Sequence, residues 1–230
     1  MNKNILTAAI GAAMIVAPLA AQADLKISGR VAGELVNNTT GTLFGDTGHS
    51  RLQFDFSNGM GFARMAMDMR PLFGAGSPGA RDAYLGLNFG SVAVSAGRIA
   101  GAVKNLEKDP FIATFLEMRG NSVKGGSLGS NSFRPSVINV TAKAGGAKWK
   151  VQTSQFDNTG TKGDLSASVS GKMMGAKVYA GYNNLGNSGN TFYKVGGSMD
   201  FGDVKGKLYY ENDGGTGLAR FVVGAEMGMG

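Results

Sequence analysis

The sequence predicts an all-β fold, a transmembrane antiparallel up-and-down β-barrel of about 12 strands. Glycine makes up 38 of the 230 residues, and such a content disfavours helices. Apolar and polar residues alternate in many segments, and long and short connections alternate between those segments. The chain has no cysteine and a single histidine, which excludes a disulfide scaffold, a thiolate metal site and a histidine-rich metal centre.

Residues 1–23 have the pattern of a cleavable secretory signal peptide. Lys3 gives a positive start, residues 5–20 are apolar, and Ala21-Gln22-Ala23 is a small-x-small cleavage site. The alternative is a transmembrane helix, but the apolar run is shorter than the roughly 20 residues that a span needs. We therefore expect an exported protein whose barrel occupies residues 24–230. Cleavage lowers the net charge from +7 to +6 because it removes one lysine.

The strands are predicted from a period of two in the hydrophobicity. In residues 24–35, for example, Leu25, Ile27 and Val31 share one face, whereas Lys26 and Arg30 share the other. Segments of nine to eleven residues of this kind suit a tilted crossing of a bilayer. The twelve predicted strands are 25–36, 50–57, 61–70, 80–89, 92–98, 134–143, 147–156, 164–172, 176–184, 191–201, 204–212 and 218–229.

The connections between these segments alternate regularly in length. Tight turns are expected at 58–60, 90–91, 144–146, 173–175 and 202–203, and longer loops at 37–49, 71–79, 99–133, 157–163, 185–190 and 213–217. Outer-membrane barrels have short turns at one end and long loops at the other. An even number of strands places both termini at the short-turn end.

A β-sandwich, which buries its apolar faces, is the main alternative fold. The apolar faces here contain small residues such as Gly29, Ala83 and Ala167, which are poor material for a thick core. Lipid requires only apolarity, so the barrel is favoured. Aromatic residues near the predicted strand ends fit the girdles of a membrane barrel: Phe56, Phe62, Phe89, Phe156, Tyr182, Tyr193, Phe201 and Phe221.

The first half of the chain resembles the Gram-negative general porins, particularly the neisserial and burkholderial type. The resemblance rests on Ser50-Arg51-Leu52-Gln53-Phe54, on the hairpin sequence of residues 81–90 (RDAYLGLNFG), on the stretch from Val92 to Arg98, and on Asn131-Ser132-Phe133-Arg134. It is good over about 24–100 and recognisable to about 156. Members of this family usually have sixteen strands, more than 300 residues and a terminal phenylalanine. This chain ends in Gly230, so we expect either a truncated chain or a compact relative with a weaker insertion signal. The even strand count favours a complete, compact barrel.

The third loop, 99–133, is far longer than the others. Asp109 can cap a short helix with Pro110 at its first position, and an apolar stripe follows at Phe111, Ile112, Phe115 and Leu116. The resemblance implies that this loop folds inward and narrows the lumen. An external, solvated loop is the alternative, which the apolar stripe disfavours.

Odd and even positions of a strand face opposite sides of the sheet, and we call this alternation parity. It indicates which charged residues face the predicted lumen. Twelve are basic: Lys26, Arg30, Arg51, Arg64, Arg70, Lys143, Lys148, Lys150, Lys177, Lys194, Lys205 and Lys207. Six are acidic: Glu34, Asp55, Asp68, Asp200, Glu211 and Glu226. Arg98 and Arg134 have the apolar parity, but they adjoin the third loop, where a bulge can turn them inward.

The resemblance implies a constriction at which basic wall residues face acidic residues of the third loop. The candidate pore-lining residues are Arg30, Arg51, Arg64, Arg70, Arg98, Arg134, Lys148, Lys150, Glu107, Asp109 and Glu117. The excess of basic residues predicts a weak anion preference. The alternative is that these charges pair with one another and leave little selectivity.

The resemblance implies an outer-membrane porin that passes ions and small hydrophilic solutes by passive diffusion, as a homotrimer in contact with outer-membrane lipid and without a cofactor. The alternative is a plugged barrel that binds a partner at the cell surface. An enzyme is disfavoured because His49, beside Ser50, is the sole imidazole. Nucleic-acid binding is disfavoured because the basic residues spread along the strands without a cluster.

Overall fold

The computed structural model describes residues 24–31, 33–38, 41–46, 50–69, 79–104, 106, 133–154, 163–186, 190–214 and 217–227. The predicted signal peptide, residues 1–23, lies outside this part of the chain. No helix among the described residues is long and apolar enough to cross a membrane. These residues form fourteen strands in two sheets.

The larger sheet has twelve strands and is antiparallel throughout, with each strand beside its neighbours in the order β1-β4-β5-β6-β7-β8-β9-β10-β11-β12-β13-β14. Its strands are β1 (Asp24–Arg30), β4 (Arg51–Asn58), β5 (Gly61–Asp68), β6 (Gly79–Asn88), β7 (Val92–Ala100), β8 (Phe133–Ala144), β9 (Ala147–Thr153), β10 (Leu165–Met173), β11 (Ala176–Leu185), β12 (Asn190–Phe201), β13 (Val204–Asp213) and β14 (Leu218–Met227). The predicted count of twelve strands and their sequential pairing are confirmed.

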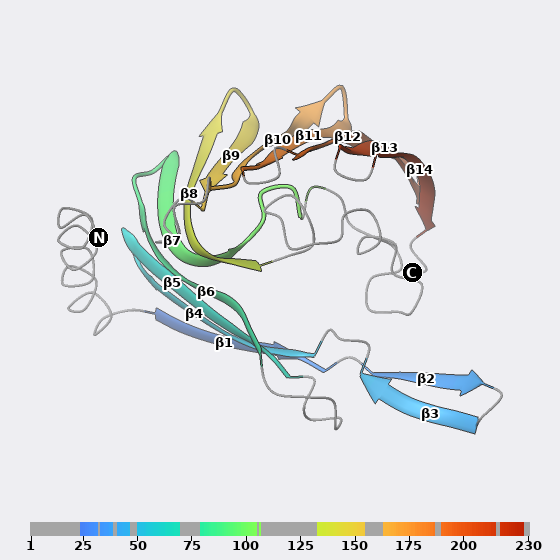
Figure 1. Ribbon diagram of the computed structural model, residues 1–230, viewed down its shortest axis with the longest axis horizontal. Helices are drawn as coiled ribbons and strands as arrows, with labels where there is room; N and C mark the ends of the chain where they lie inside the picture. The colour runs from blue at the N-terminus through green and yellow to red at the C-terminus, as the bar shows by residue number, and fades with distance from the viewer. Residues whose placement is uncertain are drawn as a thin grey trace.

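A separate hairpin is the main departure from the predicted elements. β2 (Gly33–Asn38) pairs with β3 (Gly41–Asp46) in a sheet of their own. The first predicted strand, 25–36, is therefore divided after Arg30, and most of the predicted loop 37–49 is β-structure. Figure 1 shows this hairpin projecting from the larger sheet beside β1.

The larger sheet curls around a central space, from β1 at the bottom of Figure 1, through β7 on the left, to β14 on the upper right. Within the described residues β1 pairs with β4 and β14 pairs with β13, so these two strands form the ends of the sheet. Successive strands are antiparallel, and every second connection between them is a short turn. All of these short turns therefore lie at one edge of the curled sheet, here called the turn end. The opposite edge is the loop end.

The tight turns depend on backbone conformations that favour glycine. Between β8 and β9, Gly145 and Gly146 have φ values of 60° and 73°, and their neighbours Ala144 and Ala147 pair directly. A two-residue hairpin turn with positive φ at both positions matches the right-handed twist of the strands. The turn sequence therefore sets the register of β8 against β9.

An irregularity in the pairing of β7 with β8 lies where the chain leaves the sheet for the third loop. The register shifts between Gly97 and Ile99. Gly97 has a φ of 137°, and a Cβ atom there would lie 2.3 Å from the backbone oxygen of Ala83. Bulges of this kind re-aim the side chains that follow them. Ile99 is buried against Val137 and Tyr84 as a result.

Candidate functional site

The two faces of the sheet have the opposite character to those of a water-soluble protein. Large apolar side chains are exposed on the outer face, with Val223 80% and Ile27 59% accessible. The inner face buries polar groups, with Ser166 and Asn183 at 0% and Gln152 at 1%. Polar inside and apolar outside is the pattern of a barrel that spans a membrane. The inner face is therefore the candidate functional site.

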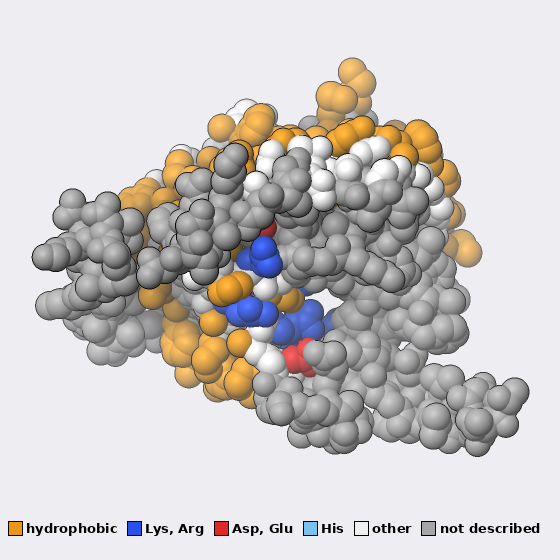
Figure 2. All heavy atoms as spheres, in the orientation of Figure 1, with side chains coloured by type: hydrophobic (Ala, Val, Ile, Leu, Met, Phe, Trp, Pro, Cys, Tyr) orange, Lys and Arg blue, Asp and Glu red, His pale blue; other side chains and the backbone are white. Residues whose placement is uncertain are grey.

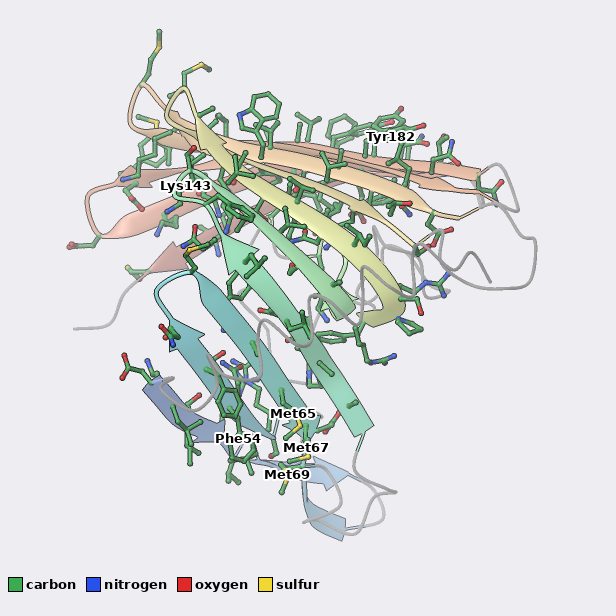
Figure 3. The ribbon with its side chains drawn as sticks, turned by 90° about the vertical axis from the view of Figure 1, so that its left-hand side faces the viewer. Phe54, Met65, Met67, Met69, Lys143 and Tyr182 are labelled. Carbon is green, nitrogen blue, oxygen red and sulfur yellow. The ribbon has the colours of Figure 1, made fainter. Side chains whose placement is uncertain are left out.

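Aromatic side chains mark two levels on the outer face. At the loop end, Tyr210 lies between Tyr193 and Phe221, with ring centroids 5.9 and 4.8 Å away, and Tyr182 pairs with Tyr193 on the next strand. Figure 3 shows Tyr182 on the outside of the sheet near this end. At the turn end, exposed aromatic rings belong to Phe89, Trp149 and Phe201.

The separation of these levels fits a bilayer. Tyr193 and Phe201 are both on β12, and the strand between them covers roughly 26 Å at about 3.3 Å per residue. A tilt of about 40° reduces this length to a height of roughly 20 Å, close to the apolar band of outer-membrane barrels, about 25 Å tall. Phe62, which we expected in a girdle, lies on the inner face, where its ring meets Tyr84 edge-on at 6.3 Å. Phe156 lies outside the described residues.

The beginning of the third loop is attached to the inner face. Gln152 donates a hydrogen bond of 3.0 Å to the backbone oxygen of Ala100. Ser168 donates another of 3.0 Å to the oxygen of Ala102, and the Lys177 ammonium donates one of 3.0 Å to the oxygen of Leu106. Three neighbouring strands, β9, β10 and β11, thus hold the chain as it enters the interior.

Apolar contacts reinforce this attachment. Val103 and Leu106 are buried with Tyr179 and Phe192 in one cluster on the inner face. A Cβ atom on Gly181 would lie 2.7 Å from Leu106 and 2.8 Å from Val103. The absence of a side chain at this glycine leaves the space that the loop occupies. Residues 101–104 and 106 therefore lie against the inner face of the sheet.

Charged groups gather beside this loop segment, around Asp82. The Asp82 carboxylate accepts a hydrogen bond from the backbone of Ala100 and lies within electrostatic range of Arg64, Arg81 and Lys104. Lys104 is buried, with its ammonium 3.7 Å from the centre of the Phe133 ring. Figure 2 shows Lys and Arg side chains inside the opening in the middle of the molecule.

Several predicted lumen residues are found on the inner face. Arg64 forms an ion pair with Asp55, with 2.6 Å between Nε and Oδ1. Lys148 and Lys150 have the same parity as the inward Gln152 and lie opposite Lys143 and Thr141. Arg51 lies opposite Arg30 in the register of β1 with β4.

The two arginines beside the third loop are placed differently. Arg98 pairs with Ala83, a residue of the outer face, and so has the outer parity itself. Its Nε donates a hydrogen bond of 2.8 Å to the backbone oxygen of Ala80. Arg134 lies opposite the inward Ile99 and forms an ion pair of 3.1 Å with Asp164. The remaining candidates Arg70, Glu107, Asp109 and Glu117 lie outside the described residues.

Two predicted lumen residues of opposite charge, Lys194 and Glu211, are buried together. Lys194 and Glu211 lie opposite each other on β12 and β13 and form an ion pair of 3.0 Å, with side chains only 5% and 3% exposed. The Lys194 ammonium is also 4.8 Å from the centre of the Tyr209 ring. These two charges neutralise each other and hold the wall together.

Three residues of the site were missing from the predicted set: Asp82, Lys104 and Gln152. Parity alone identifies Asp82, because it alternates with Ala83 and Leu85 and shares the polar face with Tyr84. Lys104 belongs to the loop, where no periodicity indicates its direction. Gln152 has the polar parity, but its role depends on a backbone group 52 residues away.

Comparisons with known proteins agree with this arrangement. The family described as Gram-negative porin matches residues 7–229. The fold is similar to that of a loop L8 deletion mutant of OmpT, an outer membrane protein of Vibrio cholerae, at 16% identity over 87% of this chain and 70% of that chain, with a TM-score of 0.60. It is also similar to a mutant of Rh. blastica porin, at 14% identity over 90% of this chain and 81% of that chain, with a TM-score of 0.65. OmpT in a trimer form gives a TM-score of 0.61 at 16% identity, over 87% and 67% of the two chains. No curated protein sequence matches the chain.

Proposed function

We propose that the inner face of the twelve-stranded sheet lines the water-filled path of a channel. The chain belongs to the family of Gram-negative porins. It is therefore an outer-membrane channel for passive diffusion and not an enzyme. The observation that carries this proposal is the inverted distribution of polarity. Ser166, Gln152 and Asn183 are enclosed, whereas Ile27, Trp149 and Val223 face outward. A polar wall and a gradient suffice for diffusion of small hydrophilic solutes.

The third loop forms the constriction in this proposal. Its first residues are attached to β9, β10 and β11 by hydrogen bonds from Gln152 to Ala100, from Ser168 to Ala102 and from Lys177 to Leu106. The acidic loop residues Glu107, Asp109 and Glu117 follow directly in the sequence. We propose that they continue across the lumen and face the basic wall, which creates a transverse field at the narrowest point.

A weak preference for anions follows from the balance of charges on the described inner face. Asp55 is paired with Arg64, Glu211 with Lys194 and Asp164 with Arg134. Lys143, Lys148 and Lys150 lie together on β8 and β9, with Asp82 as the acid within electrostatic range of Lys150. Charged groups that line a pore select ions by sign, so this surplus favours anions.

Three further features of the proposal concern the mature protein. A signal peptide, residues 1–23, is cleaved on export to the outer membrane. The protein is a general porin of the neisserial and burkholderial type, as the hairpin sequence of residues 81–90 indicates. It assembles as a homotrimer, as OmpT of Vibrio cholerae does in its trimer form.

The test is single-channel recording of the refolded mature chain in a planar bilayer under a gradient of potassium chloride. We expect stable conductance steps and a reversal potential whose sign reports a weak preference for chloride. A folded protein that inserts and never conducts would instead support the plugged barrel. Steps with a reversal potential of the opposite sign would refute the anion preference and leave the channel intact.

A further inference from the structure

A row of lysines follows the turn end of the inner face. Each occupies an inward position of its strand close to a short turn, on β8, β9, β10, β11 and β13. We call this group the lysine rim, and its members are Lys143, Lys148, Lys172, Lys177 and Lys207. Figure 3 shows Lys143 at the end of its strand, beside the short turns.

The rim brings like charges directly opposite one another. Lys143 pairs with Lys148 across β8 and β9, and Lys172 pairs with Lys177 across β10 and β11. All four residues are exposed, and the Lys177 ammonium, which donates to the oxygen of Leu106, has two further N–H donors. Like charges in directly opposite positions of an antiparallel pair destabilise the sheet. Two such pairs on four consecutive strands therefore raise the free energy of the wall unless a negative charge binds between them.

Hydroxyl groups separate the lysines. Ser170 lies opposite Lys148, and Ser198 lies opposite both Lys177 and Lys207 on its two sides. Strands are about 4.8 Å apart, so the donors from β8 to β11 cover roughly 15 Å. Ammonium and hydroxyl donors at this spacing are too far apart for one small anion but suit several linked anionic groups.

The acidic residues near the rim are few within the described part of the chain. Asp200 forms an ion pair of 3.3 Å with Lys205, which itself lies opposite Glu226 in the register. Asp203 lies in the exposed turn between β12 and β13. The Asp82 carboxylate lies within electrostatic range of Lys150, which is two residues further from the turn than Lys148. The four lysines of β8 to β11 thus keep a local surplus of positive charge.

Among the described residues, the opposite wall has no such surplus at its turn end. There, Lys26 and Arg64 are balanced by Asp24 and Asp55, which have the same parity on β1 and β4. On β6 and β7 the corresponding positions are Asn88 and Ala93. The positive rim is therefore a local feature of one side of the channel mouth and not an even coating of the lumen.

We propose that the lysine rim is a binding site for soluble anions that carry two or more phosphate groups, at the turn-end mouth of the channel. This inference rests on the proposed function, because it requires the inner face to be open to solutes. Linked phosphates offer the dense negative charge that closely spaced lysines attract, and serine hydroxyls donate to their oxygens. The five lysines occupy inward positions of their strands, so the lysine rim faces the lumen and not the lipid headgroups.

The experiment uses the refolded mature chain in a phosphatidylcholine bilayer in potassium chloride, with pyrophosphate added to one side at a time. We expect pyrophosphate at the turn end to reduce the chloride current at lower concentration than pyrophosphate at the loop end. Higher salt weakens this block because it screens the rim. Conductance in potassium chloride alone tests the proposed function separately, since a chain that never conducts fails at that earlier step.

A double variant removes one lysine from each like-charged pair. We expect K143Q/K172Q to fold at least as well as the original chain, because it relieves the repulsion, and to weaken the block about tenfold. The matched control compares K172Q with K26Q, which removes one inner-face charge near the turn end of the opposite wall and retains the block. If the double variant fails to refold, K172Q alone serves, with a weakening of about threefold.

Three outcomes would overturn the inference. One is a conducting channel without any block by pyrophosphate at the turn end. Another is a block that K143Q/K172Q leaves unchanged, or that K26Q weakens as much as K172Q does, which would indicate a general field in the lumen. The third is an effect of the rim variant that arises only when phosphatidylglycerol is added to the bilayer and pyrophosphate is absent, which would assign the lysines to lipid headgroups.

Discussion

Gln152, in the wall strand β9, donates a hydrogen bond of 3.0 Å to the backbone oxygen of Ala100, the last residue of β7. Gln152 is 1% exposed, and its partner is the point from which the third loop leaves the sheet. An amide side chain that faces lipid would lack partners, and one that faces an open pore would remain hydrated. This bond supports the proposal that the loop begins by turning into the interior.

Removal of the hydrogen bonds that hold the loop is expected to widen the channel. The double variant Q152L/S168A loses the bonds to Ala100 and Ala102, each of which contributes about 1 kcal/mol. We expect a larger and noisier single-channel conductance without loss of folding. The control S28A removes an inner-face hydroxyl from the opposite wall and keeps the original conductance. Equal conductance of Q152L/S168A and the original chain would contradict the constriction.

A side chain at Gly181 is expected to displace the same loop segment. Its Cβ would meet Leu106 at 2.7 Å and Val103 at 2.8 Å, distances that force the neighbours to move. The series G181A and G181V should raise the conductance progressively, because the second variant fills more of the space. Gly224 provides the control, since a Cβ there has no described atom within 4 Å. A decrease in conductance with G181V would show that the loop stays in place and the new side chain obstructs the path.

The buried pair Lys194–Glu211 is expected to matter for stability more than for selectivity. Each single variant, K194M or E211L, leaves one charge buried alone and should lower the free energy of unfolding by about 3–5 kcal/mol. The double variant K194M/E211L should recover most of that loss, because no unpaired charge remains. Urea unfolding in lipid vesicles, followed by tryptophan fluorescence of Trp149, measures these differences. Equal losses for the single and double variants would refute the coupling.

A charge on the outer face is expected to be far more costly than the same charge on the neighbouring inner position. V223R places an arginine on the face that contacts lipid, at a cost of about 2–4 kcal/mol near the bilayer midplane. G224R places it on the inner face, in open space, and should change selectivity more than stability. Refolding yield in vesicles and unfolding in urea compare the two variants. A larger loss for G224R would reverse the assignment of the faces.

The strands were predictable because their signal is local. Alternation over eight to ten residues, as in the segment around Ser166, Ser168 and Ser170, fixes both the strand and its inward face. The short turns were predictable because glycines at positions such as Gly145 and Gly146 mark positive φ. The sequence does not predict the β2–β3 hairpin, because residues 33–36 continue the alternation of the first predicted strand and residues 37–49 are expected to form a loop.

The site was only partly predictable because its contacts join distant parts of the chain. Ser168 and Ala102 are 66 residues apart, and Lys177 and Leu106 are 71 apart. No periodicity records such a pairing. Arg98 and Arg134 show the same limit, because the register shift between Gly97 and Ile99 depends on how β7 meets β8 after the third loop.

The central claim is that solutes pass along the inner face of the sheet, and the most direct test is the accessibility of single cysteines in the conducting channel. The chain contains no cysteine, so S170C and V169C each carry one thiol, on the inner and the outer face of β10. A bulky, charged, water-soluble thiol reagent should lower the conductance of S170C channels in discrete steps and leave V169C channels unchanged. A response of V169C without a response of S170C would contradict the claim.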